Sequence, residues 1–230
     1  MKKLVSLLLA LCLIFALGVS GFAASFPANG FSDVPRSAWY AEAVDFVKAS
    51  GLMDGVSSDR FDPAGNVTRA MVITVLYRLA GRQDVSGQSN PFRDVPNDSN
   101  CWYRDAVIWG VKNGVTDGDG SANVFSPNKA ITREQMSTMI VRFLLSQAEM
   151  DDASAQMIQR LDAKTASALL KNEFRDASSI SSWAAVSVLI CKMTGIVDGY
   201  EDGTFRPQAT LSRAECAQIF LNLYTIGTQG

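Results

Sequence analysis

The sequence predicts an all-α protein in which three copies of one helix–loop–helix unit pack into a single pseudo-threefold domain. A short segment with a hydroxyl residue followed directly by an arginine occurs three times. Before each copy, aromatic, acidic, glycine and proline residues recur in the same order. Apolar residues with helical periodicity occupy the two stretches of each unit that a loop separates. Together these observations indicate one supersecondary unit present in triplicate.

The repeated segment starts the second helix of each unit. Its copies are Val67–Met71, Ile131–Gln135 and Leu211–Glu215. The hydroxyl residue is a good N-cap, because its oxygen accepts a hydrogen bond from an amide of the first helical turn. In the second and third copies, Gln135 and Glu215 complete a capping box. The arginine, in contrast, faces the positive end of the helix dipole. Its presence in all three copies therefore indicates a specific role.

The rest of each unit keeps a fixed order and spacing. A Phe-x-Asp segment comes first, then a tryptophan, then a glycine twelve residues after the tryptophan. A Phe-x-Pro segment follows, and the arginine stands eight residues after its phenylalanine. The phenylalanines of both segments are predicted core residues. The recurring residues are, in unit order, Phe31, Asp33, Trp39, Gly51, Phe61 and Pro63; Phe92, Asp94, Trp102, Gly114, Phe125 and Pro127; and Phe174, Asp176, Trp183, Gly195, Phe205 and Pro207.

Both helices of each unit follow from apolar spacing. The first begins near the tryptophan and ends at the glycine, which adopts a positive φ at little steric cost. In the second, apolar residues lie three, six, seven and ten positions after the arginine, and form one stripe. These are Val72, Val75, Leu76 and Leu79; Met136, Met139, Ile140 and Phe143; and Cys216, Ile219, Phe220 and Leu223. A lone helix pair cannot bury such a stripe, so the three units should share a core.

The segments outside the units differ in character. Residues 1–24 read as a signal peptide, with Lys2 and Lys3 before an apolar run and Gly21-Phe22-Ala23 as the cleavage signal. We therefore expect an exported protein with no other membrane segment. Residues 146–173 form a connector without glycine or proline, and apolar residues such as Ala168 and Leu169 predict an extra helix there.

Composition excludes several functions. The net charge of −2 gives no support to a nucleic-acid partner, and the absence of histidine rules out histidine ligands and histidine-dependent nucleophilic catalysis. Three cysteines follow the leader. A disulfide between Cys191 and Cys216 is conceivable, but small buried apolar residues are the better interpretation.

The three units resemble the S-layer homology (SLH) family. The resemblance rests on Phe-x-Asp-Val, the tryptophan, the Gly-x-x-Asp-Gly loop, Phe-x-Pro and the Thr-Arg-Ala-Glu-type helix start. It covers residues 31–81, 92–145 and 174–226 as SLH repeats 1, 2 and 3. It implies a three-pronged all-α module around a central helical bundle. It also implies non-covalent anchoring of an exported protein to the bacterial cell wall, at the cell surface or S-layer.

The resemblance further implies a ligand and its sites. The ligand would be an anionic secondary cell-wall polysaccharide, often bearing a pyruvate ketal on N-acetylmannosamine, bound in grooves between neighbouring prongs. The residues carried over are Arg69, Arg133 and Arg213, with Asp33, Asp94 and Asp176, and Trp39, Trp102 and Trp183. This chain departs from the family pattern at Met71, Glu134, Gln135, Ser212, Ala177 and Ala184. These departures put equal binding by all three grooves in doubt.

Each proposed site residue has an alternative interpretation. The arginine and the free amides at the helix start would form a carboxylate receptor, or the arginine would pair with an aspartate of its own or a neighbouring unit. The tryptophans would stack on a sugar or anchor the core. The loop at Asp117 invites a calcium interpretation, but Ala122 and Asn128 stand where an EF-hand needs glycine and glutamate.

The sequence therefore predicts a non-catalytic wall-binding protein without metal or cofactor, and with other cell-surface proteins as potential partners. Two alternatives remain open at this stage. One is a structural subunit that assembles into a lattice through its own repeats. The other, less favoured, is a glycan-cleaving enzyme with paired carboxylates.

Overall fold

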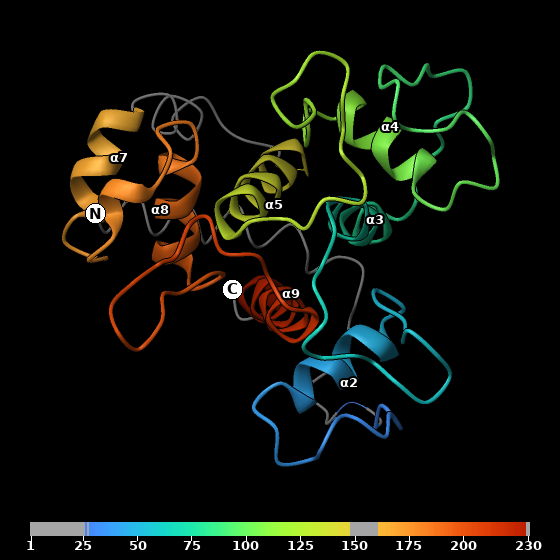
Figure 1. Ribbon diagram of the computed structural model, residues 1–230, viewed down its shortest axis with the longest axis horizontal. Coiled ribbons are helices and arrows are strands. Elements are labelled where there is room, and N and C mark those ends of the chain that lie inside the picture. The colour runs from blue at the N-terminus through green and yellow to red at the C-terminus, as the bar shows by residue number, and fades with distance from the viewer. Residues whose placement is uncertain (1–25, 27, 148–160, 229–230) are drawn as a thin grey trace. The chain divides into compact units, whose positions relative to one another are not determined.

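The computed structural model describes residues 26, 28–147 and 161–228, and these are helical with no β-strand (Figure 1). The predicted all-α class is thus confirmed. The helices are α2 (Ala41–Ala49), α3 (Arg69–Leu79), α4 (Arg104–Lys112), α5 (Arg133–Gln147), α7 (Ala163–Leu170), α8 (Ala185–Thr194) and α9 (Arg213–Thr228), with the 3-10 turn η2 (Ala177–Ser179). The predicted signal peptide, and residues 148–160 of the connector, lie outside the described residues.

Each repeat contains the two predicted helices, α2 and α3, α4 and α5, or α8 and α9. The first helix of each repeat is followed by the predicted glycine in the left-handed region. The φ angles are 66° at Gly51, 68° at Gly114 and 73° at Gly195. A side chain at such an angle is strained, so glycine at this position ends the helix at the least cost.

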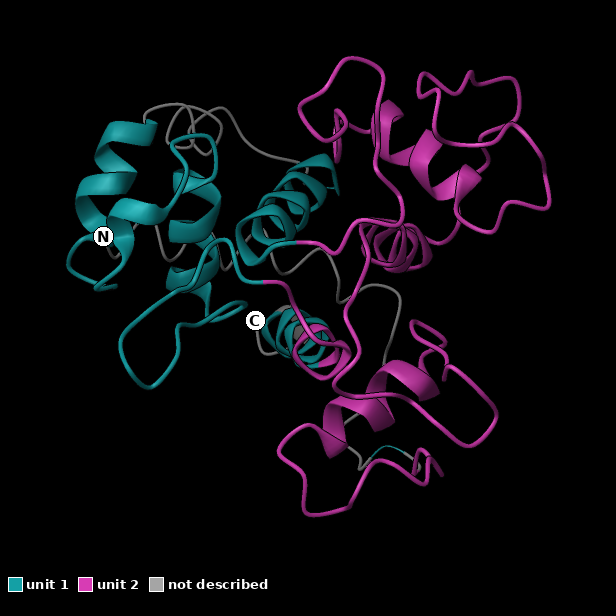
Figure 2. Cartoon of the chain, viewed as in Figure 1, with its two compact units in different colours: residues 1–26, 132–209, 218–230 teal, residues 27–131, 210–217 magenta. Residues whose placement is uncertain are grey.

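The described chain divides into two compact units whose boundaries cut across the repeats (Figure 2). Unit 1 contains 132–209 and 218–230, and unit 2 contains 27–131 and 210–217. Within unit 2, α3 of repeat 1 packs against α4 of repeat 2. Within unit 1, α5 of repeat 2 packs against α8 of repeat 3. The repeats therefore do not fold as independent beads, because the second helix of one packs on the first helix of the next.

All three repeats meet inside unit 2, at the residue two positions before each arginine. The Val67 N–H donates to the Leu211 carbonyl (2.9 Å), the Ile131 N–H to Val67 (2.9 Å) and the Leu211 N–H to Ile131 (3.3 Å). The three side chains are fully buried. This closed ring of backbone hydrogen bonds joins one residue from each repeat, so the three helix starts are fixed by one another.

The core follows the predicted stripes closely. Of the twelve stripe residues, all are buried except Leu79, which is partly exposed. The six phenylalanines of the repeated segments are also buried. Helix α7 confirms a helix in the second half of the connector. Its buried residues are Ala166 and Leu170, whereas Ala168 and Leu169 are exposed. The apolar residues that predicted this helix, Ala168 and Leu169, are therefore not the ones that it buries.

Candidate functional site

The three arginines are almost completely buried, and each binds a loop of the next repeat. Arg69 of repeat 1 binds repeat 2, Arg133 of repeat 2 binds repeat 3, and Arg213 of repeat 3 binds repeat 1. The exposed fractions of Arg69, Arg133 and Arg213 are 2%, 5% and 6%. In each, Nε donates to the carbonyl of the Phe-x-Pro phenylalanine and Nη2 donates to a carbonyl of the Asp-Gly loop. The acceptors are Phe125 (2.8 Å) and Gly118 (2.6 Å) for Arg69, Phe205 (2.7 Å) and Asp198 (2.6 Å) for Arg133, and Phe61 (2.7 Å) and Asp54 (2.6 Å) for Arg213.

Each guanidinium also lies against an aromatic ring. The guanidinium carbon is 4.9 Å from the centre of the Phe125 ring for Arg69, and 4.4 Å from that of Phe61 for Arg213. Arg133 lies 5.0 Å from the Phe205 ring and 4.6 Å from the Tyr200 ring. The ring faces attract the cation and shield it from water. Sequence reasoning missed this contact, although phenylalanine and arginine keep a fixed spacing, because the phenylalanine belongs to another repeat.

The three aspartates hold the loops that bind the arginines. Both oxygens of each carboxylate accept backbone N–H groups of the Phe-x-Pro segment in the same repeat. The donors are Phe61 and Asp62 to Asp33, Phe125 and Ser126 to Asp94, and Phe205 and Arg206 to Asp176, at 2.7–2.9 Å. The middle residue of each segment has φ between 56° and 59°, an uncommon conformation. The aspartate therefore fixes a strained turn, and the turn presents its carbonyl to the arginine.

The proposed ion pair between arginine and aspartate takes an indirect form. One residue separates them: Asp33 accepts from the Phe61 N–H, and the Phe61 carbonyl accepts from Arg213. Burial lowers the pKa of the Arg213 guanidinium, and nearby groups including Asp62 and Asp33 act in the opposite direction. Burial raises the pKa of the Asp33 carboxyl, but hydrogen bonds from the Phe61 and Asp62 amides outweigh it, so that this pKa lies below its ordinary value. The Asp33 carboxyl is therefore ionised at neutral pH, and an arginine side chain stays protonated in proteins.

The first-turn amides are not free, which corrects the predicted receptor of arginine plus open helix terminus. In repeat 1 the Arg69 N–H donates to Lys129 (3.0 Å), Ala70 to Pro127 (3.0 Å), and Met71 to the Thr68 hydroxyl (3.3 Å). Repeats 2 and 3 use their amides in the same way, with acceptors Ala209, Pro207 and Thr132, and Gly65, Pro63 and Ser212. These carbonyls also offset the positive end of the helix dipole, which explains why an arginine is tolerated there.

The predicted capping boxes are confirmed. The Thr132 N–H donates to Gln135 Oε1 (3.3 Å) and the Ser212 N–H to Glu215 Oε2 (2.8 Å). Repeat 1 has Met71 at this position and relies on the Thr68 hydroxyl cap. The helix starts are therefore equivalent in their backbone and differ only in the residue that closes the cap.

The three tryptophans lie at the surface. Their exposed fractions are 64% for Trp39, 58% for Trp102 and 56% for Trp183, so the core-anchor interpretation is wrong. Trp39 and Trp102 each contact the following tyrosine edge to face, with ring centroids 5.3 Å and 5.1 Å apart. Ala184 is the corresponding residue after Trp183. Exposing more than half of the largest apolar side chain at the same position in three repeats favours a contact with a ligand.

Glu134 gives the contact between repeats 2 and 3 a network of its own. It stands where the other repeats have Ala70 and Ala214, and it is buried. Its carboxylate accepts from the Ser181 N–H (3.0 Å), the Ser181 hydroxyl (2.9 Å) and the Gln208 amide (2.7 Å). A buried carboxylate requires such partners. Sequence analysis identified the substitution but not its partners, which lie 47 and 74 positions further along the chain.

The remaining candidates have structural roles. In the described part of the chain, Cys101, Cys191 and Cys216 form no disulfide. Cys191 and Cys216 are buried, as the apolar interpretation predicted, and burial raises the pKa of the Cys216 thiol to about 12. In the predicted turn after Asp117, Asp119 accepts from the Ser121 N–H and the Ser126 hydroxyl. Over the described ranges, the acidic and cysteine side chains form no cluster suited to a metal ion.

Comparison with known proteins extends these observations. The chain is 29% identical to an endoglucanase of Bacillus sp. (strain KSM-635) over 96% of its own length and 22% of the relative. It is 28% identical to the surface-layer 125 kDa protein of Lysinibacillus sphaericus over 84% of its length and 14% of the relative. It is 29% identical to the cellulosome-anchoring protein of Acetivibrio thermocellus over 81% of its length and 37% of the relative. The chain thus spans well under half of each of these relatives.

The described helices include none that combines the length and apolar character needed to cross a membrane.

The sequence profile of the S-layer homology domain matches residues 30–70, 91–137 and 173–217, one copy in each repeat and more than half of the chain in total. With surface-layer and cell-surface proteins among its relatives, the chain is an exported protein of the cell surface. It belongs to the S-layer homology domain family, whose domains are non-catalytic modules that anchor proteins at the cell surface.

Proposed function

We propose that this chain anchors to the cell wall by binding an anionic secondary cell-wall polysaccharide, with pyruvate ketals on N-acetylmannosamine as the charged groups. Three sites would bind the polysaccharide. Each contains the arginine of one repeat together with the loop, aspartate and tryptophan of the next repeat, and repeat 1 is next after repeat 3. They comprise Arg69, Asp94 and Trp102; Arg133, Asp176 and Trp183; and Arg213, Asp33 and Trp39. The main observation that supports this proposal is that the tryptophan is exposed at the same position in all three repeats.

The arginine would contribute its positive charge and its remaining N–H donors to the ligand, although its side chain is almost completely buried. A guanidinium has five N–H donors, and the loop carbonyls take Nε and Nη2. Among the described residues, Nη1 of Arg69 and of Arg213 has no protein partner, and neither atom is a buried unsatisfied donor. Each of these arginines therefore keeps donors for a ligand carboxylate. A charge-assisted hydrogen bond of this kind is about twice as strong as a neutral one.

The three sites differ in the residues around the arginine. At the site of Arg133, Glu134 adds a buried carboxylate, and Ala184 follows the tryptophan instead of a tyrosine. The negative charge that Glu134 adds to this site weakens the attraction for an anionic ligand. This site should therefore bind the anionic sugar more weakly than the sites of Arg69 and Arg213.

Binding to purified cell walls, before and after removal of the secondary polysaccharide, tests the proposal. The chain without residues 1–24 should sediment with intact walls and remain in solution with the extracted walls. A parallel experiment without walls should show no ordered assembly at the same protein concentration. Equal sedimentation with both wall preparations would contradict the proposal. Ordered assemblies without polysaccharide would favour a self-assembling lattice subunit instead.

A further inference from the structure

Each repeat contacts the next through a joint, formed by the start of its second helix and the loop of the next repeat. In all three joints the arginine donates to two loop carbonyls, and the first two amides of the helix donate to two further carbonyls. Every residue carries a main-chain carbonyl, whatever its side chain. These contacts would therefore fit any two repeats and cannot determine which repeats become neighbours.

Packing between helices distinguishes the joint of repeats 1 and 2. Here α3 packs on α4, and Ile73, four residues after the arginine, is fully buried. A Cβ atom added at Gly110 of α4 would lie 2.6 Å from Ile73 Cδ1 and 3.1 Å from Ile73 Cγ1, whereas carbon atoms pack at about 3.5–4.0 Å. Gly110 therefore leaves the space that the isoleucine side chain occupies.

The residues at the same two positions of the other joints have graded sizes. The joint of repeats 2 and 3 has Ser137 and Cys191, and the Cys191 thiol donates to the Ser137 carbonyl at 3.8 Å. The joint of repeats 3 and 1 has Ala217 and Val47. All four are fully buried. Across the three joints, the second-helix residue becomes smaller from isoleucine through serine to alanine, while the first-helix residue becomes larger from glycine through cysteine to valine. Large residues are thus matched with small ones.

The joint of repeats 2 and 3 also has a charge to match. The buried Glu134 carboxylate accepts from the N–H and the hydroxyl of Ser181 and from the side-chain amide of Gln208. Gln208 follows the proline of the Phe-x-Pro segment, where repeat 1 has Ala64. An alanine has no side-chain donor. Against repeat 1, Glu134 would therefore lose one of its partners, which is costly for a buried carboxylate.

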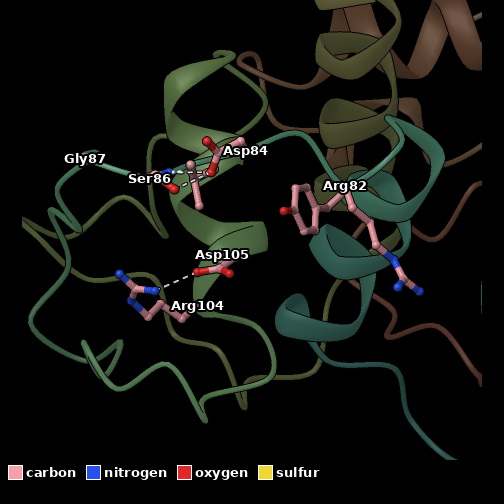
Figure 3. Close-up of a pocket in the computed structure, with 8 residues that line it drawn as sticks. Arg82, Asp84, Ser86, Gly87, Arg104 and Asp105 are labelled. Carbon is pink, nitrogen blue, oxygen red and sulfur yellow. Dashed lines mark hydrogen bonds and ion pairs between the residues drawn. The ribbon is translucent and has the colours of Figure 1, made fainter.

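Polar residues near the end of α3 and the start of α4 provide no comparable match for repeats 1 and 2. They border a pocket of about 420 Å³. Their hydrogen bonds link Asp84 to Ser86 within the connecting segment and Arg104 to Asp105 within α4 (Figure 3). None of these bonds joins α3 to α4, so the selectivity of this joint rests on apolar packing such as that of Ile73 on Gly110.

We propose that the repeats recognise their neighbours through these side chains. Ile73 of repeat 1 fits the glycine of repeat 2 and would clash with the larger residues that the other repeats have at that position. Glu134 of repeat 2 fits repeat 3, which alone has both the serine and the glutamine at the required positions. Because each proposed polysaccharide site combines an arginine with the tryptophan of the next repeat, this recognition also decides which residues share a site. It requires no ligand and therefore stands or fails independently of wall binding.

Urea unfolding of the chain without residues 1–24 tests the joint of repeats 1 and 2. Alanine normally stabilises a helix relative to glycine, but Gly110→Ala should lower the folding equilibrium constant about tenfold, because it overpacks the contact with Ile73. Adding Ile73→Val removes Cδ1 and should raise the urea midpoint again. The added Cβ also lies 3.2 Å from Thr116 Cγ2 of the same repeat, and Ile73→Val would not relieve that clash. A midpoint of Gly110→Ala at or above the wild type, or no recovery in the double variant, would overturn the inference.

Transfer of the isoleucine–glycine pair to the joint of repeats 2 and 3 tests whether the match is general. Ser137→Ile should lower the midpoint by overpacking. Cys191→Gly should lower it in the wild-type background, because glycine destabilises a helix, yet raise it in the Ser137→Ile background. If Ser137→Ile alone does not fold, the double variant should regain the wild-type circular dichroism spectrum. A double variant no more stable than Ser137→Ile would contradict recognition by size.

A third comparison tests the charge match. Gln208→Ala should lower the midpoint in the wild-type background and leave it unchanged in the Glu134→Ala background, because only the carboxylate uses this amide. Asn128→Ala, the same position in repeat 2, is the control. Asn128 is exposed and lies in the joint where Ala70 replaces the glutamate, so its loss should leave the midpoint unchanged. Equal effects of Gln208→Ala and Asn128→Ala would show that Glu134 does not select repeat 3.

Discussion

Arg69→Ala should lower the free energy of unfolding by about 3–5 kcal/mol, the range for breaking a buried charged network. The substitution leaves the carbonyls of Phe125 and Gly118 without the guanidinium that they accept from. Each unsatisfied buried acceptor costs about 1–3 kcal/mol. The stacking of the cation on the Phe125 ring is lost as well. Urea unfolding followed by circular dichroism measures the change.

Two further substitutions sharpen the Arg69 prediction. Arg69→Lys keeps the charge but cannot place two donors in the fixed geometry of the fork, so it should recover only part of the lost stability. Arg93→Ala removes an exposed arginine of the same unit and should change stability by less than about 0.5 kcal/mol. A wild-type unfolding midpoint for Arg69→Ala would show that the arginine does not join repeats 1 and 2.

Replacing Trp39, Trp102 and Trp183 together with alanine should weaken wall binding on the order of a hundredfold. A stacked aromatic contact contributes about 0.5–1.5 kcal/mol, so each single change should cost about two- to tenfold in affinity. The three losses combine because one polymer can occupy several sites of the same chain. Sedimentation with intact walls over a range of protein concentrations gives the apparent dissociation constants.

The tryptophan variants should retain the stability of the wild-type chain, because all three side chains are more than half exposed. Val56→Ala, at an exposed valine of unit 2, provides the control for loss of exposed apolar surface and should bind walls normally. If the triple variant is folded and binds walls as the wild type does, the tryptophans are not part of the binding surface.

Much of the fold could be predicted because the repeats make local signals redundant. The glycine after each first helix, the N-cap hydroxyl and the apolar stripe depend on neighbours within about four residues. Three independent copies then confirm one another. The connector had no second copy, and its spacing did not identify Ala166 and Leu170 as the residues that α7 buries.

The sequence could predict which residues form the site, but not which of them contact one another. The arginines, aspartates and phenylalanines were identified by spacing, yet Arg213 and its acceptor Phe61 lie 152 positions apart. No local pattern shows that an arginine binds the following repeat instead of its own. The exposure of the tryptophans could not be predicted either. Helical spacing places Trp39 near the start of α2, but it does not decide whether the side chain faces the core or the solvent.

The sequence predicted free amides at the helix starts, but long-range hydrogen bonds occupy these amides. The Lys129 and Pro127 carbonyls that take the amides of Arg69 and Ala70 belong to another repeat. These contacts convert a helix terminus that would attract anions into a joint between repeats. The charge available to a ligand therefore lies on the guanidinium alone.

Calorimetric titration with purified secondary cell-wall polysaccharide tests the central claim most directly. The polymer is used intact and after mild acid has removed its pyruvate ketals. A charge-assisted hydrogen bond contributes about 1.5–3 kcal/mol, so removal of the ketals should weaken binding at least tenfold. Equal dissociation constants for the two polymers, or no binding of the intact polymer, would contradict the account.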